Sequence, residues 1–228
     1  MVDIEKLTRT LRTRLRDGAT LKKIAKNAQT LEDAQRFAEE AGNELFSTLN
    51  RLCDVSTMSQ DELSDALVAM SRETFAEVKR VCEKAQIAIN SQADLEGLGL
   101  LDIDFDSERV RGIAEAVAGG ADASPEYLKN LIVNNTLKTV DESAEKNSAA
   151  YENMGLKVRI IRKYDGVGLK GGTKPCQWCI DRAGTYNSVE EATAAGVFQR
   201  HPGCGCLITY EVGKKRTWQN RAGAWHEE

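Results

Sequence analysis

The stretches KPCQWCIDRAGTY (174–186) and FQRHPGCGCLITY (198–210) decide how the C-terminal part of this chain folds. They hold four of the six cysteines and one of the two histidines in 228 residues. The donors follow the spacing Cys176-x2-Cys179, then 21 residues, then His201-x2-Cys204-x-Cys206. Two short clusters of this kind, each on a turn, can close a tetrahedron of ligands around one metal ion.

The cluster offers one donor more than the four that a structural Zn²⁺ needs. A C-x2-C pair in a tight turn presents both thiolates to one ion, so Cys176 and Cys179 are the first candidates. Cys206 follows, and then His201 and Cys204. Thiolate ligation can supply ~10 kcal/mol or more to a segment that has few large apolar residues of its own. Structural zinc is therefore the favoured interpretation.

Other interpretations of the cysteines stay open. The C-x2-C pair could be a thioredoxin-like redox pair, although no βαβ pattern surrounds it. The cysteines could also form disulfides in an extracellular particle protein. A hydrolytic zinc would need a nearby acid, for which Asp181 and Glu190 are available. Cys53 and Cys82 stand alone on predicted helices and are expected to be small buried hydrophobic residues, and we assign His226 no role.

The bulk composition is typical of a soluble globular protein, with 41% hydrophobic and 29% charged residues. A net charge of −4 disfavours a globally basic nucleic-acid binder. No apolar run reaches the ~18 residues of a membrane span, and MVDIEKLTRTLRTRL at the start lacks the apolar core of a secretory signal. We expect synthesis in a reducing cytoplasm, no membrane partner and no small-molecule substrate.

Residues 1–155 are predicted to form a helical domain, a hairpin or bundle. Thr30 and Ser59 are expected to cap two long helices joined by about six residues, which predicts an antiparallel hairpin. Ser124 and Pro125 begin a later helix. The apolar positions of the hairpin recur every three or four residues: Leu31, Ala34, Ala38, Ala41, Leu45, Leu49 and Leu52, then Leu63, Leu67, Met70, Val78, Val81, Ala85 and Ile89.

Residues 156–228 are predicted to form a small α+β module stapled by zinc. KVRIIRKY (157–164) alternates and is β-branched, and CLITYEV (206–212) is a second strand candidate. DGVGLKGGTKP (165–175) is a glycine-rich loop without the residue order of a phosphate-binding loop. The final KKRTWQNRAGAWHEE has no clear period. No internal repeat is apparent.

The cysteine stretch resembles the C-terminal motif of the phage head morphogenesis family, the minor head proteins of tailed bacteriophages. That motif runs as C-x2-C, a glycine–aromatic turn, a variable gap, and H-P-x-C-x-C followed by apolar residues. The matching positions cover about 40 of 228 residues and comprise Cys176, Cys179, the turn Gly184-Thr185-Tyr186, and HPGCGC at 201–206 continuing into Leu207 and Ile208. The family commonly has arginine between its last two cysteines, where this chain has Gly205.

The resemblance implies a minor capsid protein that acts in head assembly, near the portal vertex or inside the particle. Its implied partners are capsid proteins, portal proteins or both, and its implied location is the virion after synthesis in the host cytoplasm. Packaged DNA is a further candidate partner, which the basic strip described below suggests. No catalytic residue is predicted, and the role is structural rather than enzymatic. The alternatives are a zinc-containing nucleic-acid-binding protein and a zinc hydrolase.

A basic strip begins on the first predicted helix, which ends at Asp17-Gly18, and continues beyond it. The strip suits contact with packaged DNA or with an acidic protein surface. The plainer interpretation of such a strip is a solvated helix face. The predicted contact residues are Arg9, Arg12, Arg16, Lys22 and Lys23, with Arg14 and Lys26 beside them.

Overall fold

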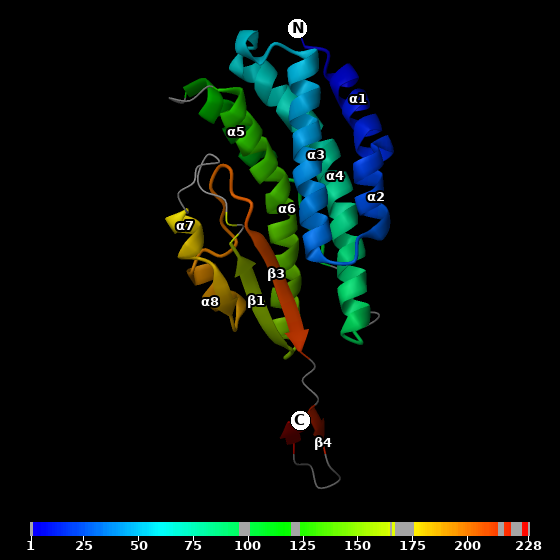
Figure 1. Cartoon of the computed structure of the whole chain (residues 1–228), viewed down its shortest axis with the longest axis vertical. Helices are drawn as coiled ribbons and strands as arrows, with labels where there is room; N and C mark the ends of the chain where they lie inside the picture. The colour runs from blue at the N-terminus through cyan, green and yellow to red at the C-terminus, as the bar shows by residue number, and fades with distance from the viewer. Residues whose placement is uncertain are drawn as a thin grey trace.

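Helices make up the described chain before residue 155, and a small antiparallel sheet with two short helices follows (Figure 1). The computed structural model describes residues 2–95, 101–119, 124–164, 166 and 176–213, and the backbone of 217–219 and 225–227. The predicted fold class, mainly α with a small C-terminal α+β part, is confirmed. The helices are α1 (Ile4–Asp17), α2 (Ala19–Asn27), α3 (Leu31–Leu52), η1 (Val55–Thr57, a 3-10 turn), α4 (Gln60–Gln92), α5 (Ser107–Gly119), α6 (Pro125–Asn153), α7 (Gln177–Ile180) and α8 (Val189–Ala194). The strands are β1 (Lys157–Lys163), β2 (Gly184–Tyr186), β3 (Leu207–Gly213), β4 (Thr217–Gln219) and β5 (Trp225–Glu227).

Helix caps fall where the sequence predicts them. The Thr30 hydroxyl accepts the Asp33 N–H at 3.1 Å, and the Ser59 hydroxyl accepts the Glu62 N–H at 3.2 Å. Both pairs complete capping boxes, which satisfy two otherwise unbonded amides at each helix start. Only residues 53–58 separate the end of α3 from Ser59, the N-cap of α4. The two helices pack against each other as the predicted hairpin.

The N-terminal part contains one helix, α2, that the sequence did not predict. The basic strip spans two helices, because the Gly18 N–H donates to the Arg14 carbonyl and ends α1. The Gly18 carbonyl then accepts the Lys22 N–H at 2.9 Å, so α2 begins at once. For α5 the capping side chain is Asp106, whose Oδ1 accepts the Arg109 N–H at 2.9 Å.

The sheet has the order β2-β1-β3, and both strand pairings are antiparallel. The predicted strand at 157–164 is β1, and the predicted strand at 206–212 is β3, shifted by one residue. On the buried face Ile160 lies opposite Tyr210, and Arg162 lies opposite Ile208. In Figure 1 β1 and β3 run beside α6, and both strands contact α6.

The hydrophobic core is continuous across residue 155. Val158, Ile160, Ile208 and Tyr210 belong to the same buried cluster as the helical leucines. The sheet therefore packs on a core that the helices largely supply. Residues after 156 contribute few large apolar side chains, and the helices provide part of the apolar surface that this segment needs to fold. The division into 1–155 and 156–228 stays a prediction.

A buried polar network fastens β3 to the helices. Gln86 of α4 donates to the Tyr151 hydroxyl of α6 at 2.6 Å and accepts the hydroxyl of Tyr210. The Tyr151 hydroxyl also donates to Asn90. Since each polar group is paired, the network fixes the orientation of these elements without leaving buried donors unmet.

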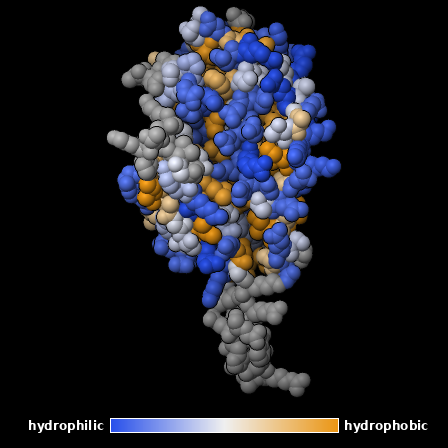
Figure 2. All heavy atoms as spheres, viewed as in Figure 1, coloured by the Kyte–Doolittle hydropathy of each residue, from blue (hydrophilic) through white to orange (hydrophobic). Residues whose placement is uncertain are grey.

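The predicted glycine-rich loop at 165–175 lies outside the described residues except for Gly166. Near the C-terminus β4 pairs with β5 in antiparallel fashion, a pairing that the sequence did not predict. Across the described helices there is no apolar stretch of the length a bilayer crossing requires. On the face shown in Figure 2, hydrophilic residues cover much of the surface, and hydrophobic residues form separate patches.

Gly42 lets α3 approach α6 closely. A Cβ at this position would lie 2.7 Å from Thr136 Oγ1 and 2.9 Å from Val133 Cα. Gly42→Ala is therefore expected to lower the free energy of unfolding by about 1–3 kcal/mol in urea denaturation, because the helices must separate.

Gly112→Ala on α5 is the matched control, since a Cβ there meets nothing within 4 Å. It should raise stability by about 0.5–1 kcal/mol through helix propensity alone. Equal effects of the two substitutions would show that the α3–α6 approach is not close.

Candidate metal centre

The first pair of donors lies on the short helix α7. Cys176 is its N-cap residue, and the Cys176 carbonyl accepts the N–H groups of Cys179 and Ile180 at 3.1 and 3.0 Å. The Tyr164 hydroxyl accepts the Cys176 N–H at 3.1 Å, which ties the start of α7 to the end of β1. One helical turn thus places both sulfurs of the C-x2-C pair on the same side.

The second group of donors lies on the turn before β3. The His201 carbonyl accepts the Cys204 N–H at 3.1 Å and closes this turn. Gly203 has a φ of +77°, a conformation that residues with a Cβ adopt only with strain. After Gly205 the chain passes Cys206 and enters β3, so the sheet holds one side of the turn in place.

The structure brings all five predicted donors together. His201 Nε2 lies 3.3 Å from Cys176 Sγ and 2.9 Å from Cys179 Sγ, while Cys179 Sγ lies 3.8 Å from Cys204 Sγ. They form two triads that share Cys179, and within each triad the donor atoms are within 4.8 Å of one another: Cys176, Cys179 and His201, and Cys179, Cys204 and Cys206. Two sulfurs bound to one tetrahedral zinc at ~2.3 Å would themselves be separated by roughly 3.8 Å.

Burial and mutual hydrogen bonds shift the pKa values of the cluster thiols. All four sulfur-bearing side chains are buried, and burial raises the pKa of Cys179 to about 12. The pKa of Cys204 is raised by its hydrogen bond with Cys206 and by burial, whereas that hydrogen bond lowers the pKa of Cys206. Without a metal, Cys179 and Cys204 therefore hold their protons at neutral pH. A metal ion must displace these thiol protons in order to bind, so metal affinity falls as the pH falls.

A buried ion pair anchors the second turn to α6. Arg200 donates to both carboxylate oxygens of Asp141, at 2.5 and 2.8 Å, and the two side chains are 3% and 0% exposed. A third bond, from Arg200 Nη1 to the Cys204 carbonyl at 3.1 Å, connects this pair directly to a donor residue. The bidentate geometry fixes the guanidinium in one orientation.

Helix side chains hold further carbonyls of the same turn. Asn134 of α6 donates to the His201 carbonyl, and Lys138 donates to the Phe198 carbonyl at 3.0 Å. Gln35 of α3 donates to the Gly205 carbonyl at 3.1 Å. The helical part therefore positions the second group of donors, a role that sequence spacing did not reveal.

Arg162 of β1, which sequence patterns did not single out, donates to Cys204 Sγ at 3.3 Å. Its signal in the sequence is a basic residue at an inward-facing strand position, where an apolar side chain is usual. The alternation of KVRIIRK places Arg162 on the same face as Val158 and Ile160. A buried guanidinium at such a position calls for an anionic or polar partner.

The alternative chemistries of the cysteines gain no support from the structure. All six cysteines are free thiols, and the three-stranded sheet beside them is antiparallel rather than βαβ. Asp181 is exposed and accepts a hydrogen bond from Gln177 at 2.6 Å. Among the described residues, neither Asp181 nor Glu190 joins a group of metal donors.

The arginines of the basic strip are largely neutralised within the chain. Two of the three predicted contact arginines link α1 to α4. The pairs are Arg9 with Glu5, Arg12 with Glu73 and Arg16 with Glu77. Lys22 and Lys23 are exposed on α2. The strip stays a predicted contact site, with less free charge than the sequence indicates.

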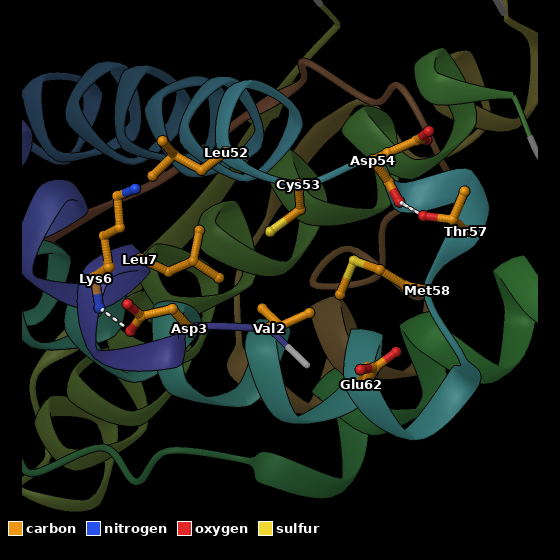
Figure 3. Close-up of a pocket in the computed structure, with 10 residues that line it drawn as sticks. All are labelled: Val2, Asp3, Lys6, Leu7, Leu52, Cys53, Asp54, Thr57, Met58 and Glu62. Carbon is orange, nitrogen blue, oxygen red and sulfur yellow. Dashed lines mark hydrogen bonds between the residues drawn. The ribbon is translucent and has the colours of Figure 1, made fainter.

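The two remaining cysteines differ from each other. Cys82 is buried as predicted, and burial raises its pKa to about 12. Cys53 is only half-buried and lines a pocket of about 390 Å³ beside Val2, Leu7 and Met58 (Figure 3).

The polar groups around the Cys53 pocket serve local backbone structure. Asp3 accepts the Lys6 N–H as the cap of α1, and Asp54 accepts the Ser56 N–H. These contacts are those of helix and turn caps, so they do not form a set of groups aimed at a ligand.

Comparison with models of protein families, with curated proteins and with solved structures found no match to this chain.

The Arg200–Asp141 pair is expected to dominate the attachment of the metal-site turn. Asp141→Ala should lower the free energy of unfolding by about 3–5 kcal/mol in urea denaturation, because it leaves the buried Arg200 uncompensated. Replacing both partners, with Asp141→Leu and Arg200→Met, should recover much of that loss.

Glu73→Ala is the matched control, because it removes an equally close partner of Arg12 in a pair whose side chains are 48% and 24% exposed. Its expected cost is below about 1 kcal/mol. An Asp141→Ala cost no larger than this would rule out an anchoring role.

Proposed function

We propose that the five-donor cluster binds one Zn²⁺ and that this ion is structural. The observation that carries the proposal is the convergence of five Cys and His donors from two turns that lie far apart in the sequence. Thiolates and imidazole suit zinc and disfavour the hard cations Mg²⁺ and Ca²⁺. Thiolate-rich sites are typically closed, with no position left for a substrate.

The ion would connect α7 to the turn before β3. Those two segments frame β2 and α8, which have three and six residues and cannot hold a shape alone. Closing that loop through a metal supplies the free energy that these short elements lack. In this proposal His201 and the cysteines act as ligands, and the protein has no catalytic residue.

We further propose that the chain is a minor head protein of a tailed phage, with capsid and portal proteins as its partners. This proposal is supported by the C-x2-C … H-P-x-C-x-C motif and by the structural role that each part of the motif has in this chain. The glycine–aromatic turn Gly184–Tyr186 is strand β2, which pairs with β1 directly after α7. The apolar residues after the last cysteine begin β3. The motif thus corresponds to one compact unit of two metal turns and their strands.

Zinc content tests the physical half of the proposal. The chain purified under reducing conditions is expected to contain about one equivalent of zinc by mass spectrometry of the metal. Cys179→Ser, which removes the donor shared by both triads, should reduce this below half an equivalent. Cys53→Ser is the control and should leave the content unchanged.

Chelation of the wild-type chain should then make the cluster thiols reactive and lower the thermal unfolding midpoint. A wild-type chain that stays below half an equivalent, with the four cluster thiols reactive from the start, would contradict the structural site.

The proposal of a minor head protein predicts the neighbours of the gene and the location of the protein. The gene is expected beside genes for a portal protein and a major capsid protein. Mass spectrometry of purified particles should detect the chain at a copy number well below that of the major capsid protein in the same sample. Particles that lack the chain, produced in a lysate that contains it, would contradict a role as a head component.

A further inference from the structure

Arg162 brings a full positive charge into the interior beside the sulfur cluster. Its side chain is among the largest buried ones, and the residue is 1% exposed. Nη1 donates to the carbonyls of Val197 and Gln199, the latter at 2.7 Å. Nη2 donates to Cys204 Sγ at 3.3 Å. Carbonyls satisfy donors, but they do not neutralise the charge that burial makes costly.

In the described part of the chain, no carboxylate forms an ion pair with Arg162, and its Nε has no hydrogen-bond partner. Arg200 makes an instructive contrast, because it is similarly buried and carries Asp141 as its counter-charge. The cluster sulfurs are therefore the groups beside Arg162 that can become anions, and Cys204 Sγ is the one that accepts a hydrogen bond from it. A buried guanidinium of this kind is stabilised when that sulfur is a thiolate.

The guanidinium is held in this position by Trp178, one of the two residues between Cys176 and Cys179. Arg162 lies over the indole ring at 5.1 Å from its centroid. The same ring meets His201 edge to face, with the centroids 5.1 Å apart. Trp178 thus contacts both Arg162 and a donor of the other triad, and the cation–π contact favours a charged Arg162 there.

The balance of charge distinguishes between the possible ligand sets. A divalent ion with three thiolates and a neutral imidazole carries one net negative charge, whereas four thiolates give two. One buried guanidinium neutralises the first set and leaves the second with an excess charge, which a buried site disfavours. Arg162 is the guanidinium that donates to a cluster sulfur, and its single charge matches three thiolates and His201.

We propose that Arg162 is the counter-charge of a metal centre formed by Cys176, Cys179, His201 and Cys204. In this assignment Cys204 is the third thiolate, because its sulfur receives the Arg162 hydrogen bond and lies 3.8 Å from Cys179 Sγ. Cys206 is then a fifth cysteine beside the site that does not bind the ion, in contrast to its higher rank among the candidates from the sequence. The inference rests on the proposed metal binding and specifies which side chains make the site.

Zinc affinity of the full chain, measured by competition with a chelator, tests the role of Arg162. Arg162→Gln retains a polar side chain without charge and should raise the Kd about 10- to 100-fold. Arg162→Lys keeps the charge and should lose markedly less. Arg182→Gln is the matched control, because Arg182 stacks on the same ring at 4.0 Å and donates to the Trp178 carbonyl. It should leave the Kd within a few-fold of wild type.

Equal Kd values for wild type, Arg162→Lys and Arg162→Gln would overturn the counter-charge. Equal losses of zinc affinity in the two Arg162 variants would also overturn it, since a role in packing alone does not depend on the charge of the side chain. A wild-type chain that binds no zinc would instead contradict the proposed function, so the two failures are distinguishable.

Cobalt substitution tests the ligand set without depending on the folding of the Arg162 variants. The intensity of the thiolate-to-Co²⁺ charge-transfer band should correspond to three thiolates in wild type and in Cys206→Ser, and to two in Cys204→Ser. A band of four-thiolate intensity in wild type, or a loss of intensity in Cys206→Ser alone, would overturn the assignment.

Discussion

The approach of two turns around Cys179 is the constraint on which the C-terminal part of this protein depends. Between β1 and β3 the described chain contains only α7, β2 and α8, which have four, three and six residues. Elements of this length bury little apolar surface and do not offset the entropy of ordering the chain. The contacts of Cys179 with His201 and Cys204 bring the two ends of this segment together. A bound metal ion would stabilise this arrangement.

The helical part contributes the platform for that closure. Its core continues into β1 and β3, and buried Asp141 holds Arg200 at the edge of the second turn. The same turn is held from α3 through Gln35. Apolar contact thus positions the sheet, and directional polar bonds position the donors. Such a division is reasonable, because a metal site requires more precise placement of its ligands than a core requires of its side chains.

Much of the helical fold follows from local rules. The capping boxes at Thr30 and Ser59 and the spacing of apolar residues predicted the long helices within a few residues, since these signals act between close neighbours. The donors were predicted for a similar reason, as the spacing of ligands on a turn is local. Helix α2 was missed because Gly18 breaks one basic amphipathic run into two helices without leaving a loop.

The supporting residues of the site could not be predicted from the sequence. Arg200 and Asp141 are 59 positions apart, and Arg162 and Cys204 are 42 apart. Their pairing results from the packing of β1, α6 and the last turn, which no local pattern encodes. The short strand β2 was missed likewise, since it exists through its pairing with β1. An arginine on the inward face of β1, in line with Val158 and Ile160, was the one available signal.

The central claim is that one metal ion joins the two cysteine turns. A crystal structure with data collected on both sides of the zinc absorption edge tests it most directly. The account predicts a single anomalous peak between α7 and the turn before β3, with thiolate sulfurs at about 2.3 Å and a His201 nitrogen at about 2.0–2.1 Å. Well-ordered density for both turns without an anomalous peak between them would contradict it.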